Sequence, residues 1–205
     1  MNLKWGQVAL LVAGLGSLVA ILLLDRKPAS SVDAAIQEVQ SLEGQSQALT
    51  PVDEAVALVN GANPMEGVMK LRELAESDPP NVDAVMWLGL FSVQSGQMEK
   101  ARERFTQVLG LEPGHFEATF QLALLDMEDS AYDRAISGFE ACMDADPNFH
   151  SGLFFTARCY DFKGQTDAAL SRYHAYLPFA PDTAVAASVE GFIQRLKSGE
   201  SGSKE

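Results

Sequence analysis

The sequence predicts an all-helical solenoid of stacked helix pairs over the second half of the chain. Three observations predict this fold class. Between Val82 and Thr183, proline recurs every 34 residues, alanine recurs in the same step, and an aromatic residue follows each alanine four positions later. The three series are Pro113, Pro147, Pro181; Ala101, Ala135, Ala169; and Phe105, Phe139, Tyr173. A fixed period of this length is the signature of a helical repeat array.

Two further series explain how each repeat folds. A small residue stands at Gly89, Ala123 and Ala157, and a turn residue stands at Gly96, Ser130 and Gly164. Two antiparallel helices approach closely only where their contact points are small, and the aromatic side chain fills the space beside that contact. The turn residue closes the first helix, and the proline ends the second. The series therefore predict two helices per repeat.

With Val82, Phe116 and His150 as first positions, this half of the chain resembles the tetratricopeptide repeat (TPR) family. The segments 82–115, 116–149 and 150–183 are the three expected repeats. The resemblance implies a right-handed superhelix that serves as a binding scaffold, and it names no particular partner. The family's tryptophan and tyrosine positions differ here; they hold Val85, Thr119 and Leu153, then Ser92, Asp126 and Tyr160.

The first 27 residues predict a membrane anchor. Trp5 to Leu24 is an uncharged run of 20 residues, long enough to cross a bilayer core as a helix of about 30 Å. A cleaved signal peptide and a buried soluble helix are the alternatives, but no small-x-small cleavage site follows the run. Positive groups flank it equally, so charge hardly decides the orientation. We expect a single-pass protein of the bacterial inner membrane with its head exported to the periplasm.

Residues 28–49 predict a helical stalk or linker. Its apolar face, between Ser30 and Leu42, suits either a solvated stalk or a short self-pairing seam. Residues 50–81 predict a degenerate repeat, because Pro79 lies 34 residues before Pro113. A terminal repeat lacks one neighbour and is expected to be atypical.

The C-terminal part predicts a capping helix over residues 184–197. Its apolar stripe covers the open face of the third repeat, and it consists of Val185, Val189, Phe192, Ile193 and Leu196. Residues 198–205 are polar, and we expect them to be disordered.

Composition and motifs limit the function. The formal net charge of −13 argues against nucleic acid and against an anionic lipid surface. The sequence contains no HExxH, no G-x-S-x-G and no Gly-rich phosphate loop, and His115 and His150 fall at repeat boundaries. We expect no enzyme activity, no cofactor and no metal. Cys142 and Cys159 suit two buried thiols, or a disulfide if the head is exported.

The TPR resemblance implies a concave groove lined by the first helix of each repeat. The chaperone-tail clamp of Lys and Asn is absent, and an apolar strip with an acidic rim stands in its place. Such a strip suits an apolar helix or peptide with basic flanks, unless residues 31–60 or a second copy of the chain cover it. The expected groove residues are Met86, Leu90, Val93, Glu117, Phe120, Leu124, Met127, Glu128, Phe154, Arg158, Asp161 and Phe162.

Together these features predict a non-catalytic, membrane-anchored TPR scaffold that binds a protein partner. The layout resembles bacterial envelope proteins with one N-terminal span, some of which assist cytochrome c maturation or the folding of exported proteins. Two alternatives stay open at this stage. The chain can be a structural subunit or homo-oligomer within a membrane complex, or an organelle import receptor with a cytosolic head.

Overall fold

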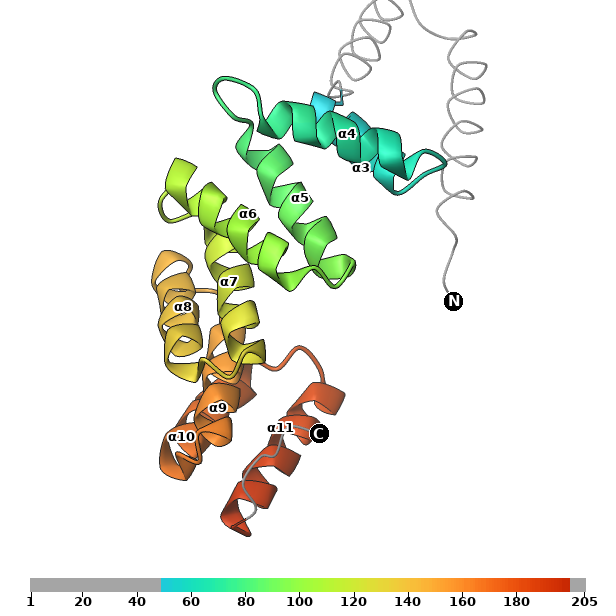
Figure 1. The fold of residues 1–205 in the computed structure, drawn as a ribbon. Coiled ribbons are helices and arrows are strands. Elements are labelled where there is room, and N and C mark those ends of the chain that lie inside the picture. The colour runs from blue at the N-terminus through green and yellow to red at the C-terminus, as the bar shows by residue number, and fades with distance from the viewer. Residues whose placement is uncertain (1–48, 200–205) are drawn as a thin grey trace, which may run out of the picture. The chain divides into compact units, whose positions relative to one another are not determined.

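The structure, a computed structural model, describes residues 49–199, and this part of the chain contains helices and no strand (Figure 1). The helices are α3 (Pro51–Val59), α4 (Pro64–Ala75), α5 (Val82–Gln94), α6 (Met98–Leu111), α7 (Phe116–Glu128), α8 (Tyr132–Ala145), α9 (Ser151–Phe162), α10 (Thr166–Tyr176), a 3-10 turn (Leu177–Phe179) and α11 (Thr183–Lys197).

The predicted anchor, the predicted stalk helix and residues 200–205 lie outside the described residues. Among the residues that are described, no helix is both long enough and apolar enough to cross a membrane. The division of the chain into an anchor, a stalk and numbered repeats remains a prediction.

Successive helices pack against one another in chain order. α3 packs on α4, α5 on α6, α7 on α8 and α9 on α10, and each of these pairs also contacts the next pair. The short turns between the two helices of a pair make each pair a helical hairpin. The apolar core follows the same order, as a series of clusters along the hairpins.

The repeated small and aromatic positions form the core of this packing. The three repeated alanines of the second helices and their aromatic partners have no exposed surface. Gly89 lies directly against the ring of Phe105, because a Cβ atom added to it would come within 2.5 Å of that ring. The sequence pattern therefore marks points of contact between helices.

The turns inside three hairpins share one backbone geometry. Gly96, Ser130 and Gly164 each have a left-handed backbone, with φ of 73°, 62° and 71°. The following amide donates to a carbonyl five residues earlier in each case, at 2.8 to 2.9 Å. This hydrogen bond defines a Schellman motif, which satisfies the last carbonyls of a helix. The sequence prediction that these residues close the first helices is confirmed.

Side chains fix where the terminal helices begin. Thr50 and Asp53 form a reciprocal capping box at the start of α3, which satisfies amide groups that have no partner within the helix. The Asp182 carboxylate accepts a hydrogen bond from the Val185 amide at 2.8 Å and caps α11.

Candidate functional site

The residues predicted to line a groove lie on three helices, α5, α7 and α9, and most of them keep part of their surface exposed. Glu128 is exposed, whereas Met86 and Asp161 are buried. The partly exposed residues are Leu90 and Val93 on α5, Glu117, Phe120, Leu124 and Met127 on α7, and Phe154, Arg158 and Phe162 on α9.

On α5, the groove prediction has to be corrected at Met86. This side chain is only 6% exposed and belongs to the same apolar cluster as Val52 and Ala55 of α3. Because α3 packs against α5, Met86 is part of the core and offers no surface to a partner. Leu90 and Val93 remain at the edge of this cluster.

On α9, the terminal helix α11 covers the predicted groove positions. The Phe192 ring of α11 lies 6.3 Å from the Phe154 ring and 5.7 Å from the Tyr173 ring, measured between centroids. The Arg158 guanidinium lies over the rings of Phe162 and Phe192, at 4.8 and 5.0 Å from their centroids. These contacts place α11 where a partner was expected.

Asp161 on α9 is the second correction to the groove prediction. Its side chain is 1% exposed, and Arg195 of α11 donates a hydrogen bond to its carboxylate. A buried carboxylate needs such a partner, because removal from water penalises an unpaired charge. Asp161 therefore helps to hold α11 and is not a rim residue.

The middle helix, α7, keeps a partly exposed face, which we call the α7 strip. It consists of Glu117, Phe120, Leu124, Met127 and Glu128, whose spacing of three or four residues places them along one side of the helix. Phe120 is the most enclosed of its apolar members, because its ring lies 5.3 to 6.5 Å from four other phenylalanine rings. Leu124 and Met127 pack on the edge of the same core cluster.

Ion pairs join neighbouring hairpins from α6 onward. Asp126 of α7 is only 8% exposed and accepts from Arg102 of α6 at 2.8 Å and from Arg134 of α8 at 3.0 Å. Arg172 of α10 pairs with Glu140 of α8 at 2.8 Å. Asp126 stands where the TPR pattern has tyrosine, and its two arginine partners explain how a carboxylate is accommodated there.

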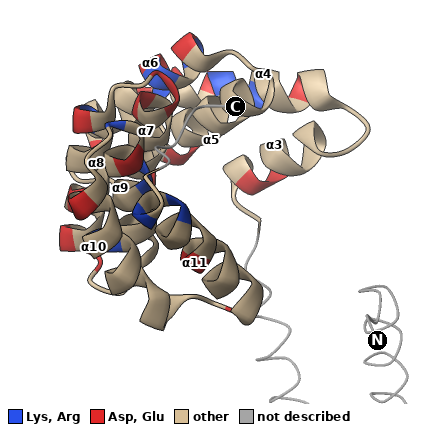
Figure 2. Cartoon of the chain, turned by 90° about the horizontal axis from the view of Figure 1, so that it is seen from below, with Lys and Arg blue, Asp and Glu red and all other residues tan. Residues whose placement is uncertain are grey.

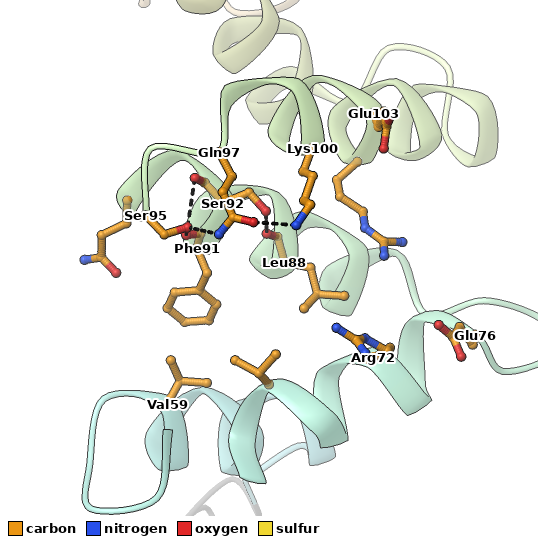
Figure 3. Close-up of a pocket in the computed structure, with 13 residues that line it drawn as sticks. Val59, Arg72, Glu76, Leu88, Phe91, Ser92, Ser95, Gln97, Lys100 and Glu103 are labelled. Carbon is orange, nitrogen blue, oxygen red and sulfur yellow. Dashed lines mark hydrogen bonds between the residues drawn. The ribbon is translucent and has the colours of Figure 1, made fainter. Parts of the chain in front are cut away.

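A cleft lies between α4 and the α5–α6 hairpin, and the groove prediction did not include it (Figure 3). We call it the α4–α6 cleft. Its volume is about 670 Å³, and its apolar lining comes from Val59, Val68, Leu88 and Phe91. Arg72 of α4 and Lys100 and Arg104 of α6 add positive charge. The repeat pattern could not predict this cleft, because the residues that line it belong to different hairpins.

The remaining charges are mostly acidic and are spread over many helices (Figure 2). Lysine and arginine residues are visible on α4 and α6 in this view, and others lie near α9 and α11. The α4–α6 cleft therefore brings three cations together on an acidic chain, beside the carboxylates of Glu76 and Glu103.

Cys142 of α8 and Cys159 of α9 are both buried and free, and no disulfide joins them in the structure. Burial raises the pKa of the Cys142 thiol to about 11, with a smaller contribution from the Glu117 carboxylate. Burial also raises the pKa of the Cys159 thiol to about 12. At neutral pH both thiols are protonated, apolar members of the core.

No protein family and no curated protein matches the sequence. Several solved structures share the fold. MamA from Desulfovibrio magneticus, from residue 41 to its end, is 18% identical with a TM-score of 0.58, over 76% of this chain and 100% of that chain. A tetratricopeptide repeat protein from Parabacteroides merdae is 13% identical with a TM-score of 0.63, over 73% of this chain and 59% of that chain.

PcrH, solved in complex with the chaperone binding region of PopD, is a further similar structure. It is 19% identical with a TM-score of 0.52, over 58% of this chain and 92% of that chain. These likenesses establish a TPR-like fold for the described part of the chain. The prediction of an all-helical repeat array is confirmed at this level.

Proposed function

We propose that the chain is a non-catalytic, membrane-anchored scaffold that binds a helix or peptide of a protein partner along the α7 strip. The observation that carries this proposal is the partial exposure of Leu124 and Met127 on α7. On the neighbouring helices, Met86 of α5 is buried in a cluster that includes residues of α3, and Phe154 and Asp161 of α9 contact α11. The PcrH structure supports the proposal, because a TPR-like fold there holds a segment of another protein.

The chemistry of the strip favours a partner with apolar side chains and basic flanks. Leu124 and Met127 supply apolar surface, and the flexible thioether of methionine adapts to different side chains. Glu117 and Glu128 stand at the two ends of the strip, where they attract lysine or arginine. An apolar helix laid along a groove or helix face is a common mode of peptide recognition.

The predicted anchor sets where the scaffold acts. We place Trp5 to Leu24 in the bacterial inner membrane and the helical head in the periplasm. Confinement to the membrane raises the effective concentration of the head toward partners at the same surface. A role in envelope protein assembly or cytochrome c biogenesis agrees with this arrangement.

A site-specific crosslinking experiment tests the proposal. A photoreactive residue replaces Leu124 in the full-length protein in its native membrane, and the same residue replaces Ala141 as control. Ala141 is exposed on α8, outside the strip. We expect a partner to be captured from position 124 and not from position 141. Equal capture from both positions would remove the α7 strip from the proposal.

Binding measurements on the captured partner make the test quantitative. Leu124→Glu should weaken its affinity at least about tenfold, which corresponds to about 1.4 kcal/mol, while Ala141→Glu should leave it unchanged. Capture of a second copy of the chain would support a structural subunit instead. Access of added protease to the head in intact cells or organelles separates an exported head from the cytosolic head of an import receptor.

A further inference from the structure

The α4–α6 cleft combines an apolar floor with charged walls. Figure 3 shows Phe91 of the α5–α6 hairpin facing Val59 of the α3–α4 hairpin across the opening, with Leu88 on the same wall as Phe91. A volume of about 670 Å³ falls in the range of sites that enclose ligands, which is roughly 300 to 1,000 Å³. The floor can therefore receive apolar side chains from a bound molecule.

The cations around this floor have no carboxylate partner within the described part of the chain. Lys100 Nζ donates to the Gln97 side chain at 2.6 Å, and Arg104 donates to the Gln107 side chain at 3.1 Å. Both acceptors are neutral amides. Arg72 forms no ion pair among the described residues. None of the three cations therefore forms an ion pair within the described part of the chain, although Glu76 and Glu103 also line the cleft.

Elsewhere in the described chain, most cations form ion pairs, and Arg158 and Lys197 are the exceptions. Arg102, Arg134, Arg172 and Arg195 pair with carboxylates on neighbouring helices, and Lys163 pairs with Asp133. Every later junction between hairpins, up to α11, therefore carries an ion pair between helices. The junction of α4 with α5–α6 carries none among the residues described, so its cations remain available to carboxylates from outside.

The charge pattern also limits the size of the ligand. Glu76 and Glu103 stand on the walls of the cleft beside the cations, and the whole chain has a net charge of −13. A long polyanion such as nucleic acid would meet repulsion along most of this surface. A short segment with a few carboxylates meets only the local cations.

We propose that the α4–α6 cleft binds a short acidic peptide segment of a partner protein, with its apolar side chains on the floor and its carboxylates on Arg72, Lys100 and Arg104. This site is separate from the α7 strip and has the opposite charge preference. Carboxylates bind arginine through two parallel hydrogen bonds, which fixes the orientation of the segment as well as adding affinity. The scaffold would then hold two segments of different charge.

A peptide-binding measurement tests the inference on the full-length protein in detergent. The probe is a fluorescent synthetic peptide of alternating Glu and Leu residues, and its dissociation constant is measured at low and at moderate salt. We expect binding that weakens with salt, because exposed charges contribute to it. A Lys-Leu peptide and a Glu-Ser peptide should both bind at least about tenfold more weakly, because each lacks one half of the required chemistry.

Matched variants locate the site. Arg72→Ala with Lys100→Ala should weaken binding of the Glu-Leu peptide at least about tenfold. Lys70→Ala with Lys197→Ala changes the net charge equally, outside the cleft, and should have less than about a twofold effect. Leu124→Glu on the α7 strip should also leave this peptide bound. Thermal unfolding confirms that each variant is folded, which we expect because the two cleft cations have no ion-pair partner to lose.

Three results would overturn the inference. Equal weakening by the two double variants would mean diffuse charge attraction with no cleft involved. Equal binding of the Glu-Ser peptide would mean that the apolar floor is unused. Binding of single-stranded RNA or of anionic lipid vesicles, lost on the same Arg72 and Lys100 substitutions, would assign the cleft to phosphate groups instead.

Discussion

The two ends of the described helical array are held in different ways. At the C-terminal end, α11 buries Val189, Ile193 and Leu196, stacks Phe192 on neighbouring rings and joins Arg195 to Asp161. At the N-terminal end, α4 leaves Met65 and Met69 73% and 63% exposed and faces a cleft whose cations are unpaired. The difference shows that a repeated pattern of core residues does not fix how charges are matched between hairpins.

The largest expected effect comes from breaking the ion pair between Arg195 and Asp161 at the C-terminal end of the array. Arg195→Ala removes the guanidinium that pairs with the buried Asp161 carboxylate, and we expect it to lower the free energy of unfolding by about 3 kcal/mol. Arg72→Ala also removes a guanidinium, at the N-terminal end of the array, and should lower the free energy of unfolding by less than about 0.5 kcal/mol. Urea unfolding of both variants measures the difference. Equal losses would mean that the two junctions are held alike.

A smaller effect concerns pH and the thiols of α8 and α9. Unfolded cysteine loses its proton near pH 9.0, whereas in the folded chain the pKa of Cys142 is about 11 and that of Cys159 about 12. Between the unfolded and folded pKa values, the unfolded chain binds fewer protons than the folded chain. The free energy of unfolding is therefore highest below about pH 9 and decreases as the pH rises. Urea midpoints at neutral and alkaline pH should show this decline.

A variant with both cysteines replaced by alanine provides the control for the alkaline experiment. It lacks the two thiols, so its decline above about pH 9 should be shallower than that of the natural chain. The same slope in both proteins would show that other groups cause the loss. The experiment therefore tests whether the two thiols on α8 and α9 are shielded from water in the folded chain.

The smallest expected effect is a gain or no change from Tyr173→Phe. The Tyr173 hydroxyl is buried and has no hydrogen-bond partner among the described residues, and burial raises the pKa of this phenol. Removing an unpaired buried hydroxyl relieves its desolvation, so thermal unfolding should show stability unchanged or higher by up to about 1 kcal/mol. A loss of stability would show that the Tyr173 hydroxyl forms a stabilising hydrogen bond.

The fold was predictable because its determinants are local and repeated. Alanine at a helix contact, an aromatic residue four positions later and a left-handed turn residue act within one hairpin, so their period alone identifies the hairpins. The caps at Thr50 and Asp182 are local for the same reason. Each of these signals is a short stretch of sequence with one structural meaning.

The binding surface was only partly predictable, because exposure depends on non-local packing. The groove prediction treated three first helices alike, but Met86 is buried in a cluster that includes residues of α3, and α11 contacts Phe154 and Asp161. The α4–α6 cleft joins residues of separate hairpins, and its unpaired cations become evident only when all ion pairs are known. Neither fact follows from a repeat pattern read one position at a time.

The matching turns at Gly96, Ser130 and Gly164 have a consequence for sequence divergence. Their closing hydrogen bonds join backbone amides to backbone carbonyls, so side chains around them are free to change as long as one residue accepts the left-handed backbone. Ser130 shows that even this residue need not be glycine. A hairpin closed by main-chain atoms can keep its geometry while most of its sequence changes, which fits the 13 to 19% identity shared with structures of the same fold.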